Sequence, residues 1–363
     1  MRDKAVSEGN RFEVLHEFAT AAREALTPRI WDYVMGGSET ETTLRRNRMA
    51  LDALAFRPRV LRDVATVETG AKVLGHDLRL PVILAPIGSL QDLVPEGGVV
   101  PTRAAARYGV LHMLSLVSEP GLEETAAAAD HPKIFQIYVR GGADWVDDLV
   151  KRAIDNGYAA ICFTVDLDYY GRRERDLAKR FKTTARQASN GEEHQSRFSW
   201  ADIERVRGNI DVPLILKGIA RADDAVLAVE HGVDMVYVSN HGGRQLDHGL
   251  GAIEMLPEIV DAVAGRAEIV VDGAIMRGAD IVKAMALGAN AVGIGRLQGL
   301  AAAAAGEDGV VRMLELLEDE VRRTLGMLGV TSYAELDASY LTSATPLDRS
   351  PLSSAFPLLE EGY

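Results

Sequence analysis

The residues from Ser239 to Gln245 are the clearest candidates for chemistry in this chain. His241 stands between Asn240 and the pair Gly242-Gly243, and Arg244 follows three residues after the histidine. A neutral imidazole is the usual general base near pH 7, and a guanidinium binds a carboxylate with two parallel hydrogen bonds. A histidine in a loop is more often a surface residue, but these glycines allow a ligand to approach the backbone closely. The segment therefore predicts a general base beside a group that binds a carboxylate. This arrangement is suited to a reaction at the α carbon of a carboxylic acid.

Three further ionisable residues could belong to the same site. Asp166 follows an apolar run and could orient His241 or stabilise its protonated form. Arg173 could supply a second arginine, although a solvated arginine is the alternative in the charged run 172–175. Lys217 ends another apolar run, where a buried charge is costly unless an anionic partner lies beside it.

The run Gly293-Ile294-Gly295-Arg296, together with Asp272-Gly273, indicates a site for a phosphate group. Glycines let the backbone approach an anion, and Arg296 supplies a forked donor. The alternative is a tight turn with a surface arginine. Phosphate sites after the seventh and eighth strands are frequent in one class of α/β barrel, so the interpretation depends on the elements that carry these residues.

Eight short apolar runs supply those elements, and amphipathic segments follow several of them. The runs are apolar throughout, as expected of strands that are buried on both faces. Eight strand–helix units in series predict an α/β protein with a parallel (β/α)8 TIM barrel; an open doubly wound sheet is the alternative. The predicted strands are Pro81–Ala85, Val110–Leu114, Ile134–Tyr138, Ala159–Val165, Pro213–Lys217, Met235–Ser239, Ile269–Asp272 and Ala291–Ile294, and the predicted helices are Trp145–Asn156, Asp223–His231, Glu254–Ala264 and Ala279–Leu287.

The remaining segments divide the chain into three parts. Residues 1–80 predict helices and a lead-in packed on the barrel, residues 81–340 the barrel, and residues 341–363 a C-terminal tail. The longest gap between strands, about 167–212, predicts an excursion after the fourth strand, and its polar middle, 183–198, indicates either a mobile segment over the top of the barrel or a plain surface loop. In a TIM barrel the carboxyl ends of the strands carry the functional groups, and all the candidates above stand at such ends.

The composition limits the possible partners. The 363 residues carry 40 Lys and Arg against 53 Asp and Glu, a formal net charge of -13, which argues against nucleic acid because phosphate binding needs a basic face. The single cysteine, Cys162, excludes an internal disulfide and a site of several thiolates, so we expect no metal and a reducing, cytoplasmic location. No apolar run is long enough for a membrane span.

The chain resembles the FMN-dependent α-hydroxy-acid oxidase and dehydrogenase family, which includes glycolate oxidase, lactate oxidase and mandelate dehydrogenase. The resemblance extends from about Trp31 to about Leu336. The run 239–247 is similar to the family's active-site signature, and 272–296 is similar to its FMN phosphate segment. Shorter matches are Phe135-Gln136-Ile137-Tyr138, Thr164-Val165-Asp166 with Gly171-Arg172-Arg173-Glu174, and Asp32-Tyr33 with Gly36-Gly37.

The resemblance implies a role for each matching residue. His241 would take a proton from the substrate or accept its hydroxyl proton, paired with Asp166. Arg173 and Arg244, assisted by Tyr33, would hold the carboxylate, and Tyr138 would contact the hydroxyl end. Lys217 would stabilise negative charge on the reduced flavin. The implied cofactor contacts are Ala85, Pro86, Ile87, Gly88, Ser115, Gln136, Thr164, Lys217 and Ser239 around the ring and Asp272, Gly273, Arg277, Gly295 and Arg296 toward the phosphate.

Several positions depart from the family pattern. Ala274 and Met276 stand where the family usually has a glycine and an arginine, so of an arginine pair only Arg277 remains. After the fourth strand, Asp-Thr-Pro is replaced by Asp166-Leu167-Asp168, and Tyr170 is a candidate for the substrate pocket or for core packing. Gly88 takes a position where oxidases of the family tend to have alanine. It leaves space beside the flavin and favours a carrier such as a quinone over oxygen, whereas the lack of a membrane segment argues the other way.

These observations predict FMN-dependent oxidation of an (S)-2-hydroxy acid to the 2-oxo acid, with electrons passed to an acceptor or to oxygen. One alternative is a family branch that oxidises an unusual hydroxy or amino group on a larger metabolite. An alternative of another class is a non-catalytic FMN-binding protein, which the presence of His241 and Arg244 disfavours. A dehydrogenase of inosine monophosphate would need a loop cysteine, and Cys162 lies inside a predicted strand. The resemblance also implies a homo-oligomer, a tetramer.

Overall fold

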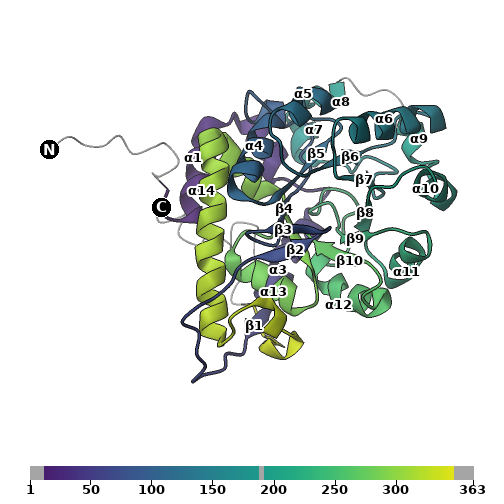
Figure 1. Ribbon diagram of the computed structural model, residues 1–363. Coiled ribbons are helices and arrows are strands. Elements are labelled where there is room, and N and C mark those ends of the chain that lie inside the picture. The colour runs from purple at the N-terminus through teal and green to yellow at the C-terminus, as the bar shows by residue number, and fades with distance from the viewer. Residues whose placement is uncertain (1–11, 188–191, 347–363) are drawn as a thin grey trace.

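A closed barrel of parallel strands lies at the centre of the molecule, with helices around it (Figure 1). The structure, a computed structural model, describes residues 12–187 and 192–346. Within these residues the barrel closes in the order β10-β11-β4-β5-β6-β7-β8-β9, and every neighbouring pair is parallel. The strands are β4 (Val82–Leu84), β5 (Leu111–Ser115), β6 (Lys133–Ile137), β7 (Ala160–Thr164), β8 (Leu214–Ile219), β9 (Met235–Val238), β10 (Glu268–Val271) and β11 (Ala291–Ile294).

The barrel strands are buried on both faces, as their continuous apolar sequences predict. One face of each strand packs inside the barrel, where side chains such as Met113, Cys162 and Tyr237 form a cluster of their own. The other face packs against the surrounding helices in the larger core. The predicted (β/α)8 fold is therefore confirmed, and each predicted strand lies within two residues of an observed one.

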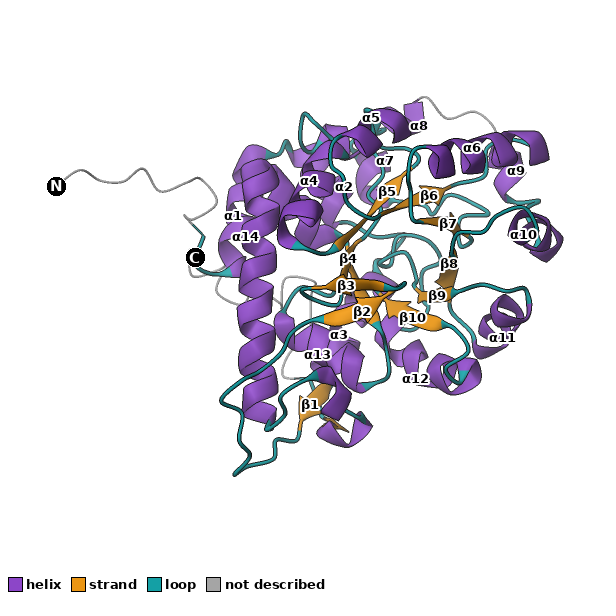
Figure 2. Cartoon of the chain, in the orientation of Figure 1, coloured by secondary structure: helices purple, strands orange, loops and turns teal. Residues whose placement is uncertain are grey.

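The helices outside the barrel follow the strands in sequence, as Figure 2 shows. The four predicted helices correspond to α6 (Ala143–Asp155), α11 (Ala222–Glu230), α12 (Ala252–Val263) and α13 (Gly278–Ala286). The sequence analysis did not name the other helices of the ring, which are α4 (Val99–Tyr108), α5 (Leu122–Ala127), α10 (Trp200–Arg207) and α14 (Arg296–Leu328). The backbone of α14 leaves the helical conformation at Ala305 and Gly306, so this element consists of two helical pieces.

The N-terminal part contributes α1 (Leu15–Ala25), α2 (Pro28–Met35) and α3 (Thr42–Asp52). Helix α1 lies along α14 at one side of the barrel (Figure 1). Helix α3 is joined to α13 by an ion pair in which Arg48 donates from both terminal nitrogens to Asp280, each at 2.8 Å. The two side chains are only 3% and 2% exposed, so this pair ties the N-terminal helices to the barrel in a buried place.

Two small sheets lie outside the barrel. Strands β2 (Ala71–Val73) and β3 (His76–Leu78) form a hairpin whose Val73 and Leu78 pack with residues of the barrel interior, and Leu74 N donates to the carboxylate of Glu268 at the start of β10. The hairpin therefore covers the amino-terminal end of the barrel. Strand β1 (Leu54–Phe56) pairs with β12 (Leu341–Ser343), which joins the beginning of the predicted tail to the N-terminal part. Residues 347–363 lie outside the described residues.

The excursion after β7 is a chain of short helices: α7 (Glu174–Ala178), α8 (Thr184–Gln187) and α9 (Glu192–Gln195). The last part of the predicted interval, about 167–212, contains α10, the helix that precedes β8. Residues 188–191, in the polar middle, lie outside the described residues. The remaining short elements are the 3-10 turns η2 (Leu90–Asp92), η3 (Tyr333–Glu335) and η4 (Ala338–Tyr340).

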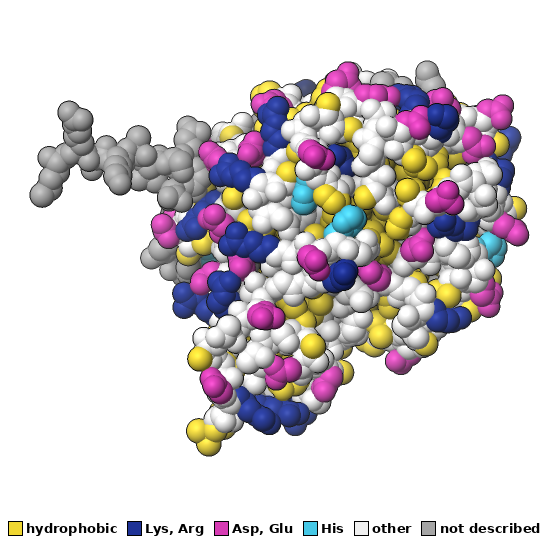
Figure 3. Space-filling view, in the orientation of Figure 1, with side chains coloured by type: hydrophobic (Ala, Val, Ile, Leu, Met, Phe, Trp, Pro, Cys, Tyr) yellow, Lys and Arg dark blue, Asp and Glu magenta, His cyan; other side chains and the backbone are white. Residues whose placement is uncertain are grey.

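On the face shown in Figure 3, acidic and basic side chains are interspersed rather than gathered by sign. In the part of the chain that the structure describes, every helix is too short or too polar to cross a bilayer.

Candidate active site

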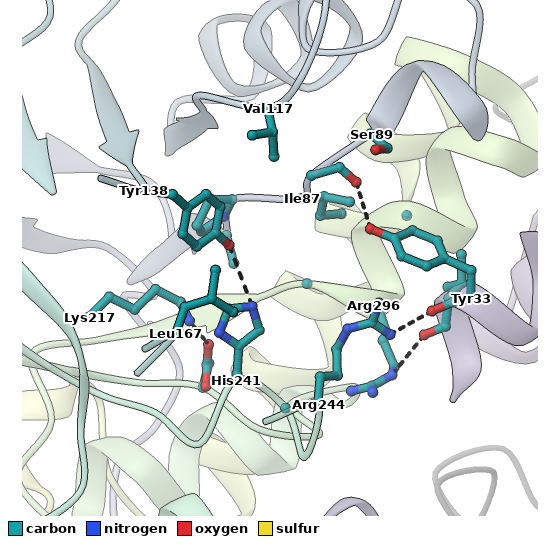
Figure 4. Close-up of a pocket in the computed structure, with 18 of the residues that line it drawn as sticks. Tyr33, Ile87, Ser89, Val117, Tyr138, Leu167, Lys217, His241, Arg244 and Arg296 are labelled. Atoms are coloured by element: carbon teal, nitrogen blue, oxygen red, sulfur yellow. Dashed lines mark hydrogen bonds and ion pairs between the residues drawn. The ribbon is translucent and has the colours of Figure 1, made fainter. Parts of the chain in front are cut away.

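A cavity opens at the carboxyl end of the barrel and brings together most of the residues singled out from the sequence (Figure 4). Fourteen of the candidates line it: Tyr33, Ala85, Pro86, Ile87, Gly88, Tyr138, Arg173, Lys217, His241, Arg244, Asp272, Gly273, Gly295 and Arg296. Asp166, Ser115, Gln136, Thr164 and Ser239 stand directly behind this wall, at or just after the ends of β5, β6, β7 and β9. Arg277 is the candidate that the structure places elsewhere.

The loop after β9 holds His241 in an unusual backbone conformation. His241, Gly242 and Gly243 have φ values of 57°, 63° and 73°, all in the left-handed region. A Cβ added to Gly243 would lie 2.4 Å from the backbone nitrogen of Leu44, so glycine is required there. The amide of His241 also donates to Ser239 Oγ at 3.0 Å. The loop therefore fixes the imidazole at the edge of the cavity, which is where the short motif predicts a base.

His241 is paired with Asp166. The imidazole Nδ1 and the carboxylate Oδ1 are 2.9 Å apart, and both side chains are about 15% exposed. Gly218 makes this position possible, because a Cβ on it would lie 2.7 Å from Cβ of Asp166. With Nδ1 donating to the carboxylate, the lone pair of Nε2 faces the cavity.

The electrostatics of this pair favour a neutral imidazole. Burial lowers the pKa of His241 below its ordinary value, and Lys217 and Arg173 act in the same direction, while Asp166 only partly offsets them. Burial alone would raise the pKa of Asp166, but His241 and Lys217 bring it below the ordinary value of an aspartate. The free enzyme thus holds a carboxylate and an unprotonated base at neutral pH.

Tyr138 and Tyr33 place two hydroxyl groups in the same cavity. The Tyr138 hydroxyl lies 3.5 Å from Nε2 of His241, and Figure 4 shows the two side chains pointing toward each other. The Tyr33 hydroxyl donates to the carbonyl oxygen of Gly88 at 2.9 Å. Burial raises the pKa of Tyr138 and of Tyr33, so both hydroxyls stay protonated and can act as hydrogen-bond donors.

Two arginines, the buried Arg173 and the partly buried Arg244, lie together at one side of the cavity. Arg244 donates to the carbonyls of Tyr33 and Gly36, at 2.5 and 3.1 Å, and its guanidinium lies over the Tyr33 ring. Arg173 is 6% exposed, and its Nε has no hydrogen-bond partner within the described part of the chain. Burial lowers the pKa of Arg244, and the neighbouring charge of Arg173 lowers it further. Two unneutralised guanidinium groups at one wall are suited to bind a carboxylate.

Lys217 belongs to a short hydrogen-bonded chain. Its Nζ donates to Ser239 Oγ at 3.1 Å, and Ser239 Oγ donates to Asp272 Oδ1 at 2.7 Å. Burial would lower the pKa of Lys217, but Asp272 and Asp166 raise it above the ordinary value, so the ammonium group stays charged. The sequence predicts an anionic partner for Lys217, and Asp272 is one such partner, since its Oδ2 lies 3.6 Å from Lys217 Nζ.

Arg296 is the best candidate for the phosphate. Its Nε and a terminal nitrogen donate to the carbonyls of Val34 and Gly36, both at 2.9 Å, and no carboxylate within the described ranges lies in ion-pair distance of it. Burial, with Arg244 and Arg173 nearby, lowers the pKa of Arg296 to about 9. Next to it, Gly295 offers open space, since a Cβ there would have no neighbour within 4 Å. A bound anion would relieve the cost of this buried cation.

The residues present fit an FMN molecule. Gln136 Nε2 and Thr164 Oγ1 are buried without a hydrogen-bond partner in the described residues, and both stand at strand ends behind the cavity. Polar atoms without partners are costly unless a ligand meets them. The site thus has unpartnered polar atoms of Gln136 and Thr164 behind the cavity wall, a cation at Lys217, and glycines beside Arg296, as a flavin ring with a phosphorylated side chain requires.

The loop after β10 differs from the sequence prediction. Arg277 turns away from the cavity and forms an ion pair with Glu320 on α14, and Gly278 N donates to the same carboxylate at 2.7 Å. Met276 instead lines the cavity and is 1% exposed. Ala274 has a φ of 64°, a conformation that glycine adopts more easily. The loop therefore brings the apolar Met276 to the cavity, whereas Arg277, which the resemblance places toward the phosphate, lies outside the lining.

Four residues of the excursion that belong to the site were not predicted from the sequence: Thr183, Ala185, Arg186 and Gln195. Gln195 accepts a hydrogen bond from Val139 N at 2.7 Å and donates to the carbonyl of Thr164 at 3.1 Å, which joins the excursion to β6 and β7. Thr183, Ala185 and Arg186 also line the cavity. An irregular polar segment carries no periodicity that would show which residues point inward. The signal that the sequence does offer is their position in the excursion after the fourth strand, over the top of the barrel.

The family described as FMN-dependent dehydrogenase matches residues 22–343 of this chain. A 4-hydroxymandelate oxidase from Amycolatopsis orientalis is 42% identical over 339 residues, which cover 88% of this chain and 95% of the relative. A peroxisomal (S)-2-hydroxyacid oxidase from Arabidopsis thaliana is 37% identical, with 90% and 95% covered, and an L-lactate oxidase from a Nostoc species is 36% identical, with 90% and 97% covered. The chain belongs to the FMN-dependent dehydrogenase family.

Solved structures agree with this assignment. A mandelate oxidase variant with (S)-mandelic acid has a TM-score of 0.86 at 41% identity, covering 93% of this chain and all of the other. A second mandelate oxidase variant, with 2-hydroxy-phenylacetamide, has a TM-score of 0.85 at 40% identity, with the same coverage. The protein is thus an FMN-dependent enzyme that oxidises 2-hydroxy acids, and the predictions of family, activity and cofactor are confirmed.

Proposed function

We propose that the enzyme oxidises an (S)-2-hydroxy acid with a bulky, aryl-type side chain to the 2-oxo acid and passes the electrons to dioxygen. The observation that carries this proposal is the His241–Asp166 pair, which shares one cavity with Tyr138, Arg173 and Arg244. Removal of hydrogen from the α position of a hydroxy acid needs a base, a hydrogen-bond donor for the hydroxyl group and a cation for the carboxylate, and this cavity holds all three.

Each side chain then has a defined task. Arg173 and Arg244 bind the substrate carboxylate, and Tyr138 donates a hydrogen bond to the substrate's hydroxyl oxygen. His241 takes the proton through Nε2, and Asp166 stabilises the imidazolium that results. FMN, when bound, supplies the two-electron acceptor. Arg296 and Gly295 would hold its phosphate, and Lys217 would stabilise the negative charge of its reduced form.

The apolar side chains of the cavity support a bulky substrate side chain. Ile87, Val117 and Leu167 line the cavity, and Figure 4 shows Leu167 beside His241 and the other two farther from it. Apolar side chains of this size favour burial of an aryl or branched group over the single hydrogen of glycolate. The relatives named 4-hydroxymandelate oxidase and mandelate oxidase support the same class of substrate.

Dioxygen as acceptor is supported by the neighbourhood of Gly88. A glycine at position 88 predicts open space here, but Val117 Cγ2 lies 2.8 Å from the position that a Cβ on Gly88 would take. A methyl group of Val117 therefore lies where the methyl group of an alanine at position 88 would be. Because that space is filled, Gly88 does not favour an electron carrier over dioxygen. The relatives reported above are named oxidases, which supports the same acceptor.

The proposal includes a cytoplasmic homotetramer. The lone cysteine is buried, and the pKa of its thiol is raised by burial, so the chain has no disulfide to gain from an oxidising compartment. The oligomer follows from the family resemblance. Light scattering coupled to gel filtration tests it, and a monomeric mass would contradict it.

A substrate panel tests the proposed activity. The purified protein is mixed without oxygen with the (S) and (R) forms of mandelate and lactate and with glycolate, and the flavin absorbance is followed. We expect (S)-mandelate to bleach the flavin fastest and (R)-mandelate to leave it oxidised. Admission of air is then expected to restore the colour and yield one hydrogen peroxide per 2-oxo acid. Bleaching by none of the acids would contradict the proposed activity, and reoxidation too slow for turnover would contradict the acceptor.

A further inference from the structure

Arg186 contributes an additional cation to the cavity, and the backbone around it is firmly held. The residue lies on α8 in the excursion after β7 and lines the cavity. Thr184 N donates to Asp92 Oδ2 at 3.0 Å, and Ala185 N donates to Ser89 Oγ at 3.2 Å. Ser89 stands at the side of the cavity in Figure 4. These two anchors tie the turn that carries Arg186 to the connection between β4 and α4, so its position over the cavity is defined.

The guanidinium of Arg186 shares one aromatic ring with the guanidinium of Arg173. Arg186 Cζ lies 4.0 Å from the centroid of the Tyr170 ring, and Arg173 Cζ lies 4.3 Å from the same centroid. The two guanidinium carbons are therefore at most about 8 Å apart. This is close enough for one small molecule that lies across Tyr170 to reach both.

The protein leaves the charge of Arg186 without a direct partner. In residues 12–187 and 192–346, no carboxylate lies in ion-pair distance of its guanidinium. Asp92 is hydrogen-bonded to Thr184, and Asp176 and Asp168 form no ion pair with any of the arginines of the cavity in those residues. Burial raises the pKa of Asp176 and of Asp168; Asp166 adds to this effect for Asp168, whereas the charges of Arg244, Arg173 and Arg186 act against it for Asp176. Cations that converge on a partly buried space and form no ion pair with a carboxylate in the described residues favour an anionic ligand.

We propose that Arg186 is a specificity-determining residue that binds a second anionic group, at the far end of the substrate's side chain. This proposal rests on the proposed function, in which Arg173 and Arg244 take the carboxylate next to the reacting carbon. The substrate class is then a 2-hydroxy acid with an apolar body and a distal carboxylate. The body would pack against Tyr170, Leu167 and Val117, and the distal group would reach the fork of Arg186.

Matched substrates test this proposal in the wild-type holoenzyme. The probes are (S)-mandelate with a carboxylate at the para position and the methyl ester of that distal group, which has similar shape and no charge. We expect kcat/KM for the acid to exceed that for the ester by about 10- to 100-fold, the range of a charge-assisted hydrogen bond that is shielded from water. We expect the difference to lie mainly in KM, because the distal group does not take part in the chemical step.

Variants assign the preference to one side chain. In Arg186→Gln we expect the ratio of acid to ester to fall to near one, and in Arg186→Lys we expect part of it to remain, because the charge persists without the fork. Arg180→Gln is the matched control, since Arg180 is an exposed arginine of the same segment that does not line the cavity. This control should keep the wild-type ratio. The flavin spectrum checks that each variant binds FMN.

Two results would overturn the proposal. One is a kcat/KM of the wild type for the distal acid that is no higher than its kcat/KM for the ester. The other is a preference for the acid that remains unchanged in Arg186→Gln. Flavin reduction by unsubstituted (S)-mandelate separates the possible failures. If mandelate reduces the flavin while kcat/KM for the distal acid and for the ester are nearly equal, Arg186 does not bind a distal anion and the proposed function stands. If no 2-hydroxy acid reduces the flavin, the proposed function itself fails, and this inference fails with it.

Discussion

At the scale of single residues, the chemistry depends on the protonation of His241. Its Nδ1 is engaged by Asp166, so only Nε2 can accept a proton from the substrate. Burial and the surrounding cations keep its pKa below the ordinary value of 6.5. The base is therefore ready over a wider range of pH than a solvated histidine would be.

The pH dependence of kcat/KM follows from this state. A base works in its unprotonated form, so activity should be lost as the pH falls through the pKa of His241 in the free enzyme. We expect the midpoint of this acid limb below pH 6.5. In Asp166→Asn the midpoint should move to still lower pH, because the carboxylate raises the pKa of the imidazole, and the rate should fall as well. A midpoint above 6.5 in the wild type would show that His241 is not the titrating base.

The carboxylate anchor can be tested at Arg173 and Arg244. We expect Arg173→Lys and Arg244→Lys each to raise KM for (S)-mandelate, because lysine keeps the charge but loses the forked geometry. The neutral analogue (S)-mandelamide should be affected less. Steady-state kinetics on both compounds in each variant gives the comparison. Equal losses for the acid and the amide would contradict carboxylate binding and favour the branch of the family that oxidises a different group.

The sequence predicts the residues of the site best where a short motif sets the geometry. His241 and Arg244 are such a case, because the glycines between them restrict the possible loop conformations. Arg277 is the opposite case: its sequence position agrees with the phosphate segment, yet the loop turns it toward Glu320 on α14, a contact between residues far apart in the chain. Arg186 lies in a segment without periodicity. Its orientation toward the cavity depends on hydrogen bonds from the amides of Thr184 and Ala185 to Asp92 and Ser89, and no local sequence pattern predicts these contacts.

At the scale of the elements, the strand ends position the site and the helices hold the strands. Continuous apolar runs made the barrel strands predictable to within two residues. The short helix α5 and the kinked α14 were harder to predict, since the apolar periodicity of such helices is brief or interrupted. The excursion could be located but not resolved into helices, because tertiary contacts such as those of Gln195 decide its course.

The ion pair between α3 and α13 gives a prediction at this scale. Removal of Asp280 leaves the buried Arg48 with Asp52 as its remaining carboxylate, at 2.7 Å, so we expect Asp280→Ala to lower the free energy of unfolding by about 3 kcal/mol, the lower end of the range for a broken buried pair. Asp280 also accepts hydrogen bonds from the amides of Met276 and Arg277, so FMN affinity should fall with stability. Denaturant titration and flavin titration measure the two effects.

The exposed pair of Arg221 and Asp223 is the control for this prediction. Asp223→Ala should leave both the unfolding midpoint and the flavin affinity unchanged, because solvent screens that pair. An Asp280→Ala protein as stable as the wild type would show that the α3–α13 pair does not tie the N-terminal helices to the barrel.

At the scale of the whole molecule, the two ends of the barrel have separate tasks. The β2–β3 hairpin covers the amino-terminal end, and the carboxyl end holds the cavity. The cavity collects Lys217, Arg173, Arg244 and Arg296, so the protein without a ligand holds several buried cations close together. FMN should therefore stabilise the whole fold as well as complete the site.

Removal of the cofactor tests this coupling. We expect the protein without FMN to have a lower Tm, and added FMN to restore it, because a ligand at 100 times its Kd stabilises the native state by about 2.7 kcal/mol. Riboflavin, which lacks the phosphate, should restore less, since it leaves Arg296 without an anion. Thermal unfolding with each flavin at equal concentration gives the answer. Equal stabilisation by the two would contradict the assignment of Arg296 to the phosphate.

The central claim is that His241 takes the proton when a 2-hydroxy acid reduces the bound flavin. The most direct measurement is a single turnover without oxygen, in which wild-type and His241→Asn proteins with equal amounts of bound FMN are each mixed with (S)-mandelate in a stopped-flow instrument. We predict that the wild type reduces its flavin and forms one 2-oxo acid per chain. The variant, with its flavin still bound, should do so at least ~100-fold more slowly. Reduction of the variant at nearly the wild-type rate would contradict the account.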